Sequence, residues 1–263
     1  MPDSLYDTHI IVVRLLIGLS LSAFALGGLM IARRFVLPRL RITEDDAGFS
    51  GAMVQAVLIF YGLIVTLIAV NTWQNYSDVS TALGQEASAI ATIYRDLGGY
   101  PEPTRSQGQA ELHDYVGYII NDAWPLQHQG TIPTGGAEFL DRFQTTLFSF
   151  EPVTESQKQL HSETLHAYNT LIESRLPRLN AVVGGLPGIL WTVVISGAIV
   201  SLISTFLFKV EDVRLHATLV FLLAVLISLV VAMIFAFDRP FRGDLGLEPD
   251  AYRLVYDHLM TKP

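Results

Sequence analysis

The segment GAMVQAVLIFYGLIVTLIAVNT, residues 51–72, decides the fold, because it has no charged side chain and is long enough to cross a lipid bilayer. A transmembrane helix needs about 20 consecutive apolar residues. Three further segments meet this requirement: residues 10–32, 186–208 and 215–237. The first of these holds one charge, Arg14, and its length disfavours the alternative of a signal peptide. We therefore predict four transmembrane helices.

The composition agrees with a membrane protein. Hydrophobic residues make up 51% of the 263 residues and charged residues 16%, against about 25% charged residues in soluble domains. This balance excludes a disordered chain and argues against a soluble enzyme. The lack of cysteine excludes disulfides, thiolate metal sites and cysteine nucleophiles. The net charge of −8 argues against a nucleic-acid partner, which attracts basic proteins.

Basic residues beside the transmembrane segments predict their orientation. Arginines crowd the short loop after the first segment: Arg33, Arg34, Arg39 and Arg41. Lys209 and Arg214 lie in the short loop between the last two segments. Because short basic loops stay in the cytoplasm, the pattern places both termini and residues 73–180 outside it.

The long region between the second and third segments has a helical pattern. The second transmembrane helix is expected to continue to residue 97, where GGYPEP at residues 98–103 breaks it. Further helices are predicted over residues 104–124, 138–150 and 154–179. A capping box from Thr154 to Gln157 opens the last of them, and Pro177 predicts a kink within it. The predicted fold is an all-α membrane protein, with four transmembrane helices and a helical extramembrane layer between the second and the third.

The predicted organisation has four parts. Residues 1–72 form a first transmembrane hairpin, and residues 73–180 form the helical extramembrane region. Residues 181–241 form a second transmembrane hairpin, and residues 242–263 form a polar C-terminal tail.

No pattern in the chain predicts an enzyme, a cofactor or a metal site. His161 and His166 flank Glu163, but five residues along a helix turn the two imidazoles to different sides, and a solvated helix face is the preferred interpretation. The carboxylates after the last segment lack the alternating oxygen ligands of an EF-hand, and a solvated acidic tail is preferred for them. They are Asp238, Asp244, Glu248 and Asp250.

One face of the second transmembrane helix is small or polar. After Gly51, its members recur at alternating steps of four and three residues: Gln55, Ile59, Gly62, Thr66, Ala69 and Trp73. One interpretation is close packing, since small residues let membrane helices approach. The other is a pore wall, in which Gln55 and Thr66 are polar and Ile59 is a hydrophobic constriction. A shorter stripe in the third helix indicates packing, and its members are Gly197, Ser201 and Ser204.

Several segments of the chain resemble bestrophin anion channels. FYGLIVTL at residues 60–67, followed by WQNY at residues 73–76, resembles their pore helix. DRPFRG at residues 238–243 resembles the segment after their last membrane helix. From about residue 33 to residue 241, the chain is more similar to a bacterial bestrophin-like group of membrane proteins without assigned function. The residues that carry this similarity include Tyr61, Tyr76, Glu86, Asp122, Trp124, Pro125, Arg175, Pro187, Trp191, Asp238, Arg239, Pro240 and Phe241.

The resemblance implies a multi-pass protein of the bacterial inner membrane. It implies a homo-oligomer, a pentamer as in bestrophins, around a pore lined by the second helix, with the lipid bilayer and inorganic ions as further partners. At Ala56 the sequence lacks a second large side chain of the bestrophin neck, and Arg242 interrupts the acidic run of their calcium clasp. The soluble region of bestrophins is cytoplasmic, which is the opposite of the orientation that the arginines predict.

Two functions remain open from the sequence. The first is an oligomeric ion channel with passive conduction along the second helices. A cation preference is expected for it, because residues 73–180 hold 13 Asp and Glu against six Lys and Arg, a net charge of −7. The second is a non-conducting membrane scaffold or sensor that binds a partner through its acidic extramembrane layer.

Overall fold

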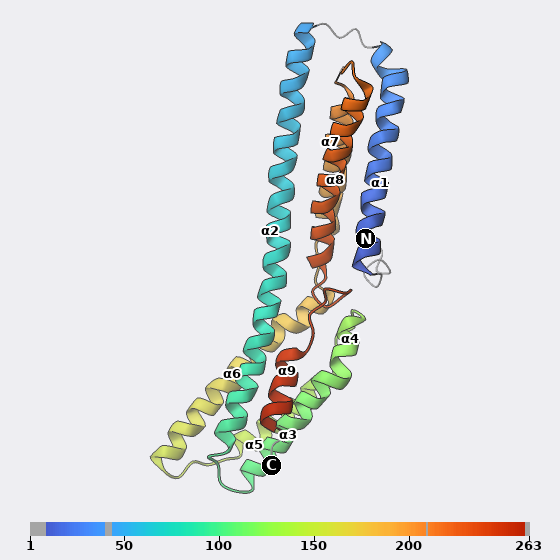
Figure 1. Cartoon of the computed structure of the whole chain (residues 1–263). Coiled ribbons are helices and arrows are strands. Elements are labelled where there is room, and N and C mark those ends of the chain that lie inside the picture. Colours follow the sequence, from blue (N-terminus) through green and yellow to red (C-terminus); the bar gives the residue numbers. More distant parts are fainter. Residues whose placement is uncertain (1–8, 40–43, 209, 261–263) are drawn as a thin grey trace. The chain divides into compact units, whose positions relative to one another are not determined.

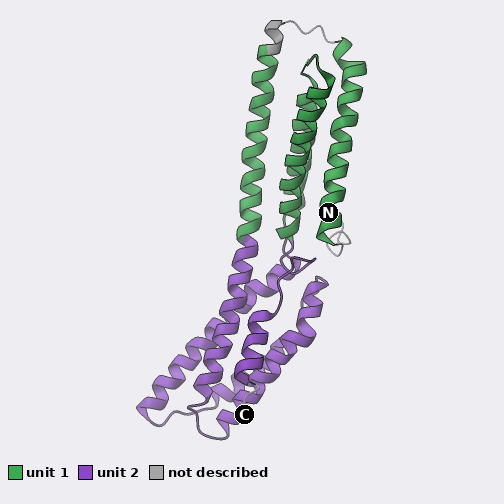
Figure 2. Ribbon diagram, viewed as in Figure 1, with its two compact units in different colours: residues 1–74, 186–238 green, residues 75–185, 239–263 purple. Residues whose placement is uncertain are grey.

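The computed structural model describes residues 9–39, 44–208 and 210–260, which form helices and short connections with no strand among them (Figure 1). Four helices in these residues are long and apolar enough to cross a membrane. The prediction of an all-α fold with four helices long enough to span a membrane is confirmed for the described residues, and the helical extramembrane layer stays a prediction. The chain divides into two compact units (Figure 2). Unit 1 is residues 1–74 and 186–238, and unit 2 is residues 75–185 and 239–263.

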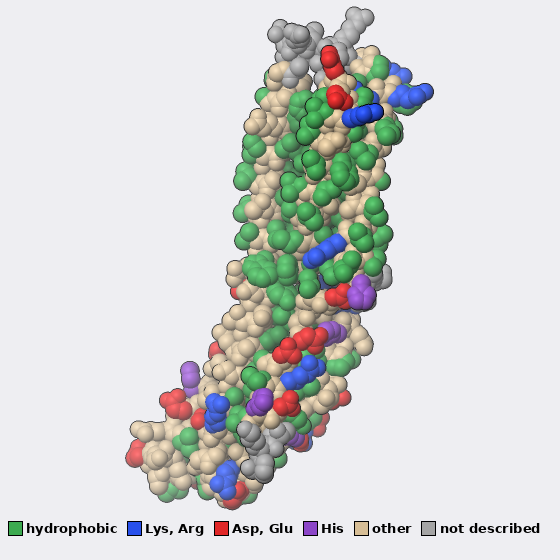
Figure 3. Space-filling view, viewed as in Figure 1, with side chains coloured by type: hydrophobic (Ala, Val, Ile, Leu, Met, Phe, Trp, Pro, Cys, Tyr) green, Lys and Arg blue, Asp and Glu red, His purple; other side chains and the backbone are tan. Residues whose placement is uncertain are grey.

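Unit 1 contains the transmembrane helices. They are α1 (Ile10–Ile31), the first part of α2 (Glu44–Leu97), α7 (Gly188–Phe206) and α8 (Val213–Asp238). α1 packs along α7 and α8, and it continues as a π-helical turn, Ala32–Val36, and a 3-10 turn, Leu37–Arg39. Figure 3 shows hydrophobic side chains over the surface of the spans, with both basic and acidic side chains at the end where these turns lie. This distribution suits a bilayer with polar boundaries.

Glycines bring the helices of unit 1 into close contact. A Cβ atom added to Gly197 of α7 would lie 2.5 Å from the ring of Tyr61 in α2. One added to Gly28 of α1 would lie 2.6 Å from the ring of Phe206. Because only glycine leaves room for these rings, the packing predicted for the stripe of α7 is confirmed at Gly197.

Unit 2 is a bundle of helices around its own core. The second part of α2 runs unbroken to Leu97, as the sequence predicts. The other helices are α3 (Thr104–Tyr118), α4 (Trp124–His128), α5 (Gly136–Phe148), α6 (Glu155–Val183) and α9 (Asp250–Val255), with π-helical turns at Ile119–Ala123 and Tyr256–Met260. Side chains from several of them form the core, among them Ile90, Leu112, Phe143 and Leu171.

The capping box predicted for α6 is confirmed. The Thr154 hydroxyl accepts the backbone N–H of Gln157 at 3.2 Å, and the Gln157 side chain accepts the backbone N–H of Thr154 at 3.2 Å. α6 then continues through Pro177 and ends at Val183, with Gly184 as its C-cap residue.

Two predicted boundaries were wrong. The helix expected to stop before Pro125 continues to His128, because a π-helical turn precedes Pro125 and proline is tolerated in the first turn of α4. The C-terminal segment expected to be a polar tail contains α9 and a π-helical turn. Tyr252 and Met260 are buried in the core of unit 2, and their burial holds this segment in place.

Candidate functional site

The predicted pore stripe of α2 divides between two faces of the helix. Gln55, Ile59, Thr66 and Trp73 are exposed, and Gly62 is half-buried. Ala69, in contrast, is only 5% exposed and packs in the core of unit 1. The helical repeat places it about 40° around the axis from Gln55, on the side of the buried Val65 and Thr72. The structure therefore keeps four exposed members of the stripe on one face and turns Ala69 toward the protein.

The opposite side of this span packs within unit 1. Val54, Tyr61, Val65, Ile68 and Thr72 are buried there. The Tyr61 hydroxyl donates to the carbonyl oxygen of Val194 in α7, at 3.2 Å. A hydroxyl inside a bilayer needs such a partner because lipid offers none. Tyr61, one of the family-motif residues, thus fixes the packed face of α2 and so decides which face stays exposed.

Asp238 holds the start of α7 in unit 1. Its two carboxylate oxygens accept hydrogen bonds from the backbone N–H of Leu186 and from Nε1 of Trp191, the latter at 3.2 Å. Pro187 is the N-cap residue of α7. Leu186 lies just before this N-cap, so the carboxylate fixes the chain that enters α7, and its negative charge interacts favourably with the positive end of the helix dipole. The structure thus brings three predicted residues together.

Arg239 holds the end of α6 in unit 2. Its Nη1 donates to the carbonyl oxygens of Val183 and Gly184, at 2.8 and 3.1 Å. These are acceptors at the C-terminal end of α6, where a cation is favourable. Pro240 and Phe241, the next two residues of the motif, are buried.

Trp124 anchors the C-terminal segment within unit 2. Its indole Nε1 donates to the carbonyl of Leu247 at 3.0 Å, and its ring packs against Phe241 and Tyr252. Tyr76 donates to the carbonyl of Leu245 at 3.0 Å. Both family-motif residues therefore hold the chain that follows α8.

The remaining motif residues of this region lie around the π-helical turn and α5. Asp122 is exposed in the turn, and Pro125 lies in the first turn of α4. The guanidinium of Arg175 packs at Gly136, the first residue of α5, where an added Cβ would lie 3.3 Å from Nη2.

A carboxylate with four hydrogen-bond donors lies at the centre of unit 2. Glu86 of α2 is 0% exposed. Its Oε1 accepts from Arg178 Nη2 at 2.9 Å and from the Tyr115 hydroxyl at 3.0 Å. Its Oε2 accepts from Arg178 Nε at 2.7 Å and from the Tyr252 hydroxyl at 2.8 Å. We call these four residues the Glu86 cluster, and it joins α2, α3, α6 and α9.

The electrostatics of the Glu86 cluster keep its arginine and its two tyrosines in fixed protonation states. Burial, and next the charge of Glu86, raise the pKa of the Tyr115 and Tyr252 hydroxyls. Burial alone would lower the pKa of Arg178, but the facing carboxylate outweighs it and the net shift is upward. The arginine therefore stays charged and both tyrosines stay protonated, which lets each of them donate to Glu86.

Sequence reasoning identified Glu86 in this cluster but missed its three partners. A signal was present in α6, where Leu171, Ser174, Arg178 and Ala181 share the buried stripe. A charged residue on a buried helix face needs a partner of opposite charge. The same rule applied to Glu86, within the apolar continuation of α2, would have indicated the pair.

The histidines weighed in the sequence make other contacts. Nδ1 of His161 is 2.9 Å from the Tyr100 hydroxyl, and Phe150 packs on both rings. Burial lowers the pKa of His161. His166 and Glu163 are exposed. Over residues 9–39, 44–208 and 210–260, no group of three or more His, Cys, Asp and Glu is arranged to hold a metal ion.

Comparison with known proteins agrees with the resemblance noted in the sequence. The Bestrophin-like domain family matches residues 19–252. No curated protein and no solved structure matches the chain. The family match extends from the middle of α1 into α9 and contains every family-motif residue described above. Since it covers most of the chain, the protein belongs to the Bestrophin-like family.

Proposed function

We propose that the protein is an oligomeric ion channel in which several copies of α2 surround the pore. The observation that carries this proposal is the exposed face of α2, where Gln55 and Thr66 lie within the span, whereas the exposed Asn71 lies near its end. An amide or hydroxyl that faces hydrocarbon without a partner costs about 2–7 kcal/mol. Assembly with this face toward a water-filled axis removes that cost.

The proposed lining is the exposed part of the stripe. It consists of Gln55, Ile59, Gly62 and Thr66, with Trp73 at the end of the span. Ile59, which is 54% exposed, is the hydrophobic constriction. An apolar ring of this kind closes a pore by excluding water. Trp73 packs edge-on against Phe237, with ring centroids 4.9 Å apart. This contact holds Trp73, the last residue of the proposed lining, in place.

The proposed ion preference is for cations. Residues 73–180 carry a net charge of −7, and they continue the chain directly from the end of the proposed pore helix. Glu86 and Arg178 neutralise each other, but Asp78, Asp114, Asp122 and Asp141 are exposed. Several copies around one axis raise the local cation concentration, an effect that weakens with salt.

The proposed setting is the bacterial inner membrane. The arginines at the end of α1 favour an orientation with residues 73–180 outside the cytoplasm, whereas the bestrophin resemblance favours the cytoplasmic side. The same resemblance supports a pentamer.

A planar-bilayer recording of the purified protein tests the proposal. Ile59→Ala is expected to raise the single-channel conductance, because it widens and wets the constriction. Leu67→Ala is the matched control. It is 71% exposed but lies about 120° around α2 from Gln55, and it is expected to leave the conductance unchanged.

Two outcomes contradict the proposal. A monomer by native mass spectrometry in mild detergent excludes a pore between copies. Silence of the parent and both variants, while all three remain folded oligomers, favours the non-conducting scaffold or sensor instead.

A further inference from the structure

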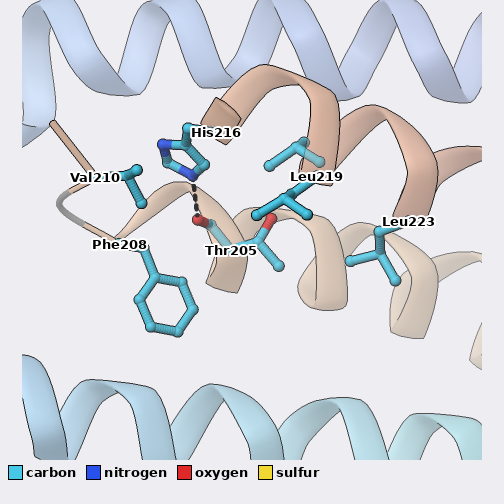
Figure 4. A pocket seen from close by; sticks show the side chains of 7 residues that line it. Thr205, Phe208, Val210, His216, Leu219 and Leu223 are labelled. Carbon is cyan, nitrogen blue, oxygen red and sulfur yellow. Dashed lines mark hydrogen bonds between the residues drawn. The ribbon is translucent and has the colours of Figure 1, made fainter. Parts of the chain in front are cut away.

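A cavity of about 330 Å³ lies in unit 1 where α7 ends and α8 begins (Figure 4). Its lining residues are Thr205, Phe208, Val210, His216, Leu219, Val220 and Leu223. Figure 4 shows Phe208 and Leu223 at opposite ends of this lining, with His216 bonded to Thr205. None of the proposed pore residues lines the cavity. The cavity is therefore separate from the proposed pore.

The polar side chains of the lining bond to the protein itself. Nε2 of His216 is 3.1 Å from the carbonyl oxygen of Thr205, which only accepts, so Nε2 carries the hydrogen. Nδ1 then accepts from Nη1 of Arg33, at 3.3 Å. The Thr205 hydroxyl donates to the carbonyl of Leu202 at 2.7 Å. With these groups satisfied, the surface that the cavity offers a ligand is hydrocarbon.

Basic side chains surround the same end of the spans. Nη2 of Arg33 donates to the carbonyl of Val210 at 2.9 Å, so the end of α1 is bonded to the loop that lines the cavity. Three more arginines at this end are exposed: Arg34, Arg39 and Arg214. The carboxylate of Asp212 accepts the backbone N–H of Arg214 at 2.8 Å and thereby caps α8. Two carboxylates of the same loop, Glu211 and Asp212, are exposed as well. Among the described side chains at this end the arginines outnumber them, so the net charge near the cavity is positive.

We propose that this cavity binds one acyl chain of an anionic phospholipid, whose phosphate lies at the exposed arginines. Three points select this ligand: the lining is hydrocarbon, the helices are long and apolar enough to cross a bilayer, and arginines near a membrane surface attract anionic lipid. Water does not fill the cavity well, since a buried water needs two to four polar partners. Leu219, a lining residue, is 54% exposed, so an acyl chain enters from the surface of α8. The proposal holds whether or not the protein conducts ions.

Photo-crosslinking of the full chain in nanodiscs tests the site. The probe is phosphatidylglycerol with a diazirine at the end of one acyl chain, diluted in phosphatidylcholine, and peptide mass mapping locates the adducts. Adducts are expected to concentrate in residues 205–223. Leu219→Trp fills the cavity and is expected to abolish them. Leu222→Trp is the matched control, because Leu222 is 56% exposed on the same helix but outside the lining.

The headgroup is tested separately. Arg34→Gln is expected to lower the adduct yield roughly fivefold, whereas Arg14→Gln, near the start of α1, leaves it unchanged. A phosphatidylcholine probe with the same acyl chain is expected to label the parent protein less. Equal labelling by the two probes, or adducts spread evenly along the exposed face of α8, overturns the proposal. The comparison of the two probes and the map of adducts along α8 are both made on the parent protein, so they test the proposal even if a variant does not fold.

Discussion

Replacing Arg178 with methionine would leave the Glu86 carboxylate buried without its cation. Glu86 is 0% exposed, and Arg178 supplies two of its four hydrogen bonds, at 2.7 and 2.9 Å. Two tyrosine hydroxyls remain, which do not neutralise the charge. Breaking one side of a buried ion pair costs about 3–5 kcal/mol. Since 1 kcal/mol corresponds to roughly 2–4 °C for a chain of this size, we expect Tm to fall by about 6–20 °C.

Tryptophan fluorescence during thermal unfolding measures this change. Trp124 is 3% exposed and packs on Tyr252, so its emission reports on unit 2. Arg175→Met is the matched control. Arg175 lies one turn earlier on α6, and its buried Nε has no hydrogen-bond partner, so its loss is expected to cost less. The double variant Glu86→Gln with Arg178→Met removes both charges, and it is expected to recover most of the lost stability. The reasoning is refuted if Arg178→Met lowers Tm by less than about 3 °C, or if the double variant recovers none of the lost stability.

Two further predictions concern pH and topology. Burial raises the pKa of Tyr115 and Tyr252, so both stay protonated in the folded protein at a pH where they ionise in the unfolded chain. Stability is therefore full below about pH 10 and falls by about 1.4 kcal/mol per pH unit for each tyrosine above it. Denaturant unfolding up to about pH 11 measures the slope, which Tyr252→Phe should reduce by about 1.4 kcal/mol per pH unit; an unchanged slope would contradict the assignment. Because the chain has no cysteine, Ser106→Cys and Ser50→Cys report topology cleanly, and an impermeant thiol reagent in intact cells is expected to label only the first. The reverse pattern would establish the bestrophin orientation.

Most of the fold follows from local signals in the sequence. The apolar runs predict the spans, because a bilayer requires helices of a minimum length, and the capping box predicts the start of α6. The predictions that were wrong concern segments whose structure depends on contacts with residues far away in the sequence. Charged residues at positions 242–250 favour a polar tail, yet Tyr252 and Met260 lie in the core of unit 2, and Ala251, Val255 and Tyr256 pack against it. The apolar residues of 250–260 form a segment too short to be told from a tail by local pattern alone, because its helix is stabilised by contacts with the rest of unit 2.

The candidate site could be predicted only in part. Helical periodicity identifies the stripe on α2, but the position of Tyr61 against Gly197 decides which edge of it packs, and the stripe itself does not show that Ala69 is buried. Glu86 and Arg178 are 92 residues apart, and Glu86 and Tyr252 are 166 residues apart. The need of each buried charge for a partner could have indicated Glu86 and Arg178 as a pair. No local spacing connects Glu86 with Tyr115 or Tyr252, so these two partners emerge only with the fold.

The neighbouring residues Asp238 and Arg239 separate the structural role of the motif from the proposed pore. In unit 1, Asp238 accepts from the backbone N–H of Leu186, just before α7, and from the indole N–H of Trp191 near the start of α7. In unit 2, Arg239 donates to carbonyl groups at the end of α6. The dipole of a helix is positive at its start and negative at its end, so each charge matches the terminus that it meets, and exchanging the two residues would place both charges at the wrong ends. Asp238 and Arg239 therefore have structural roles, because each stabilises the end of one helix. The ion pathway that we propose rests instead on the exposed face of α2.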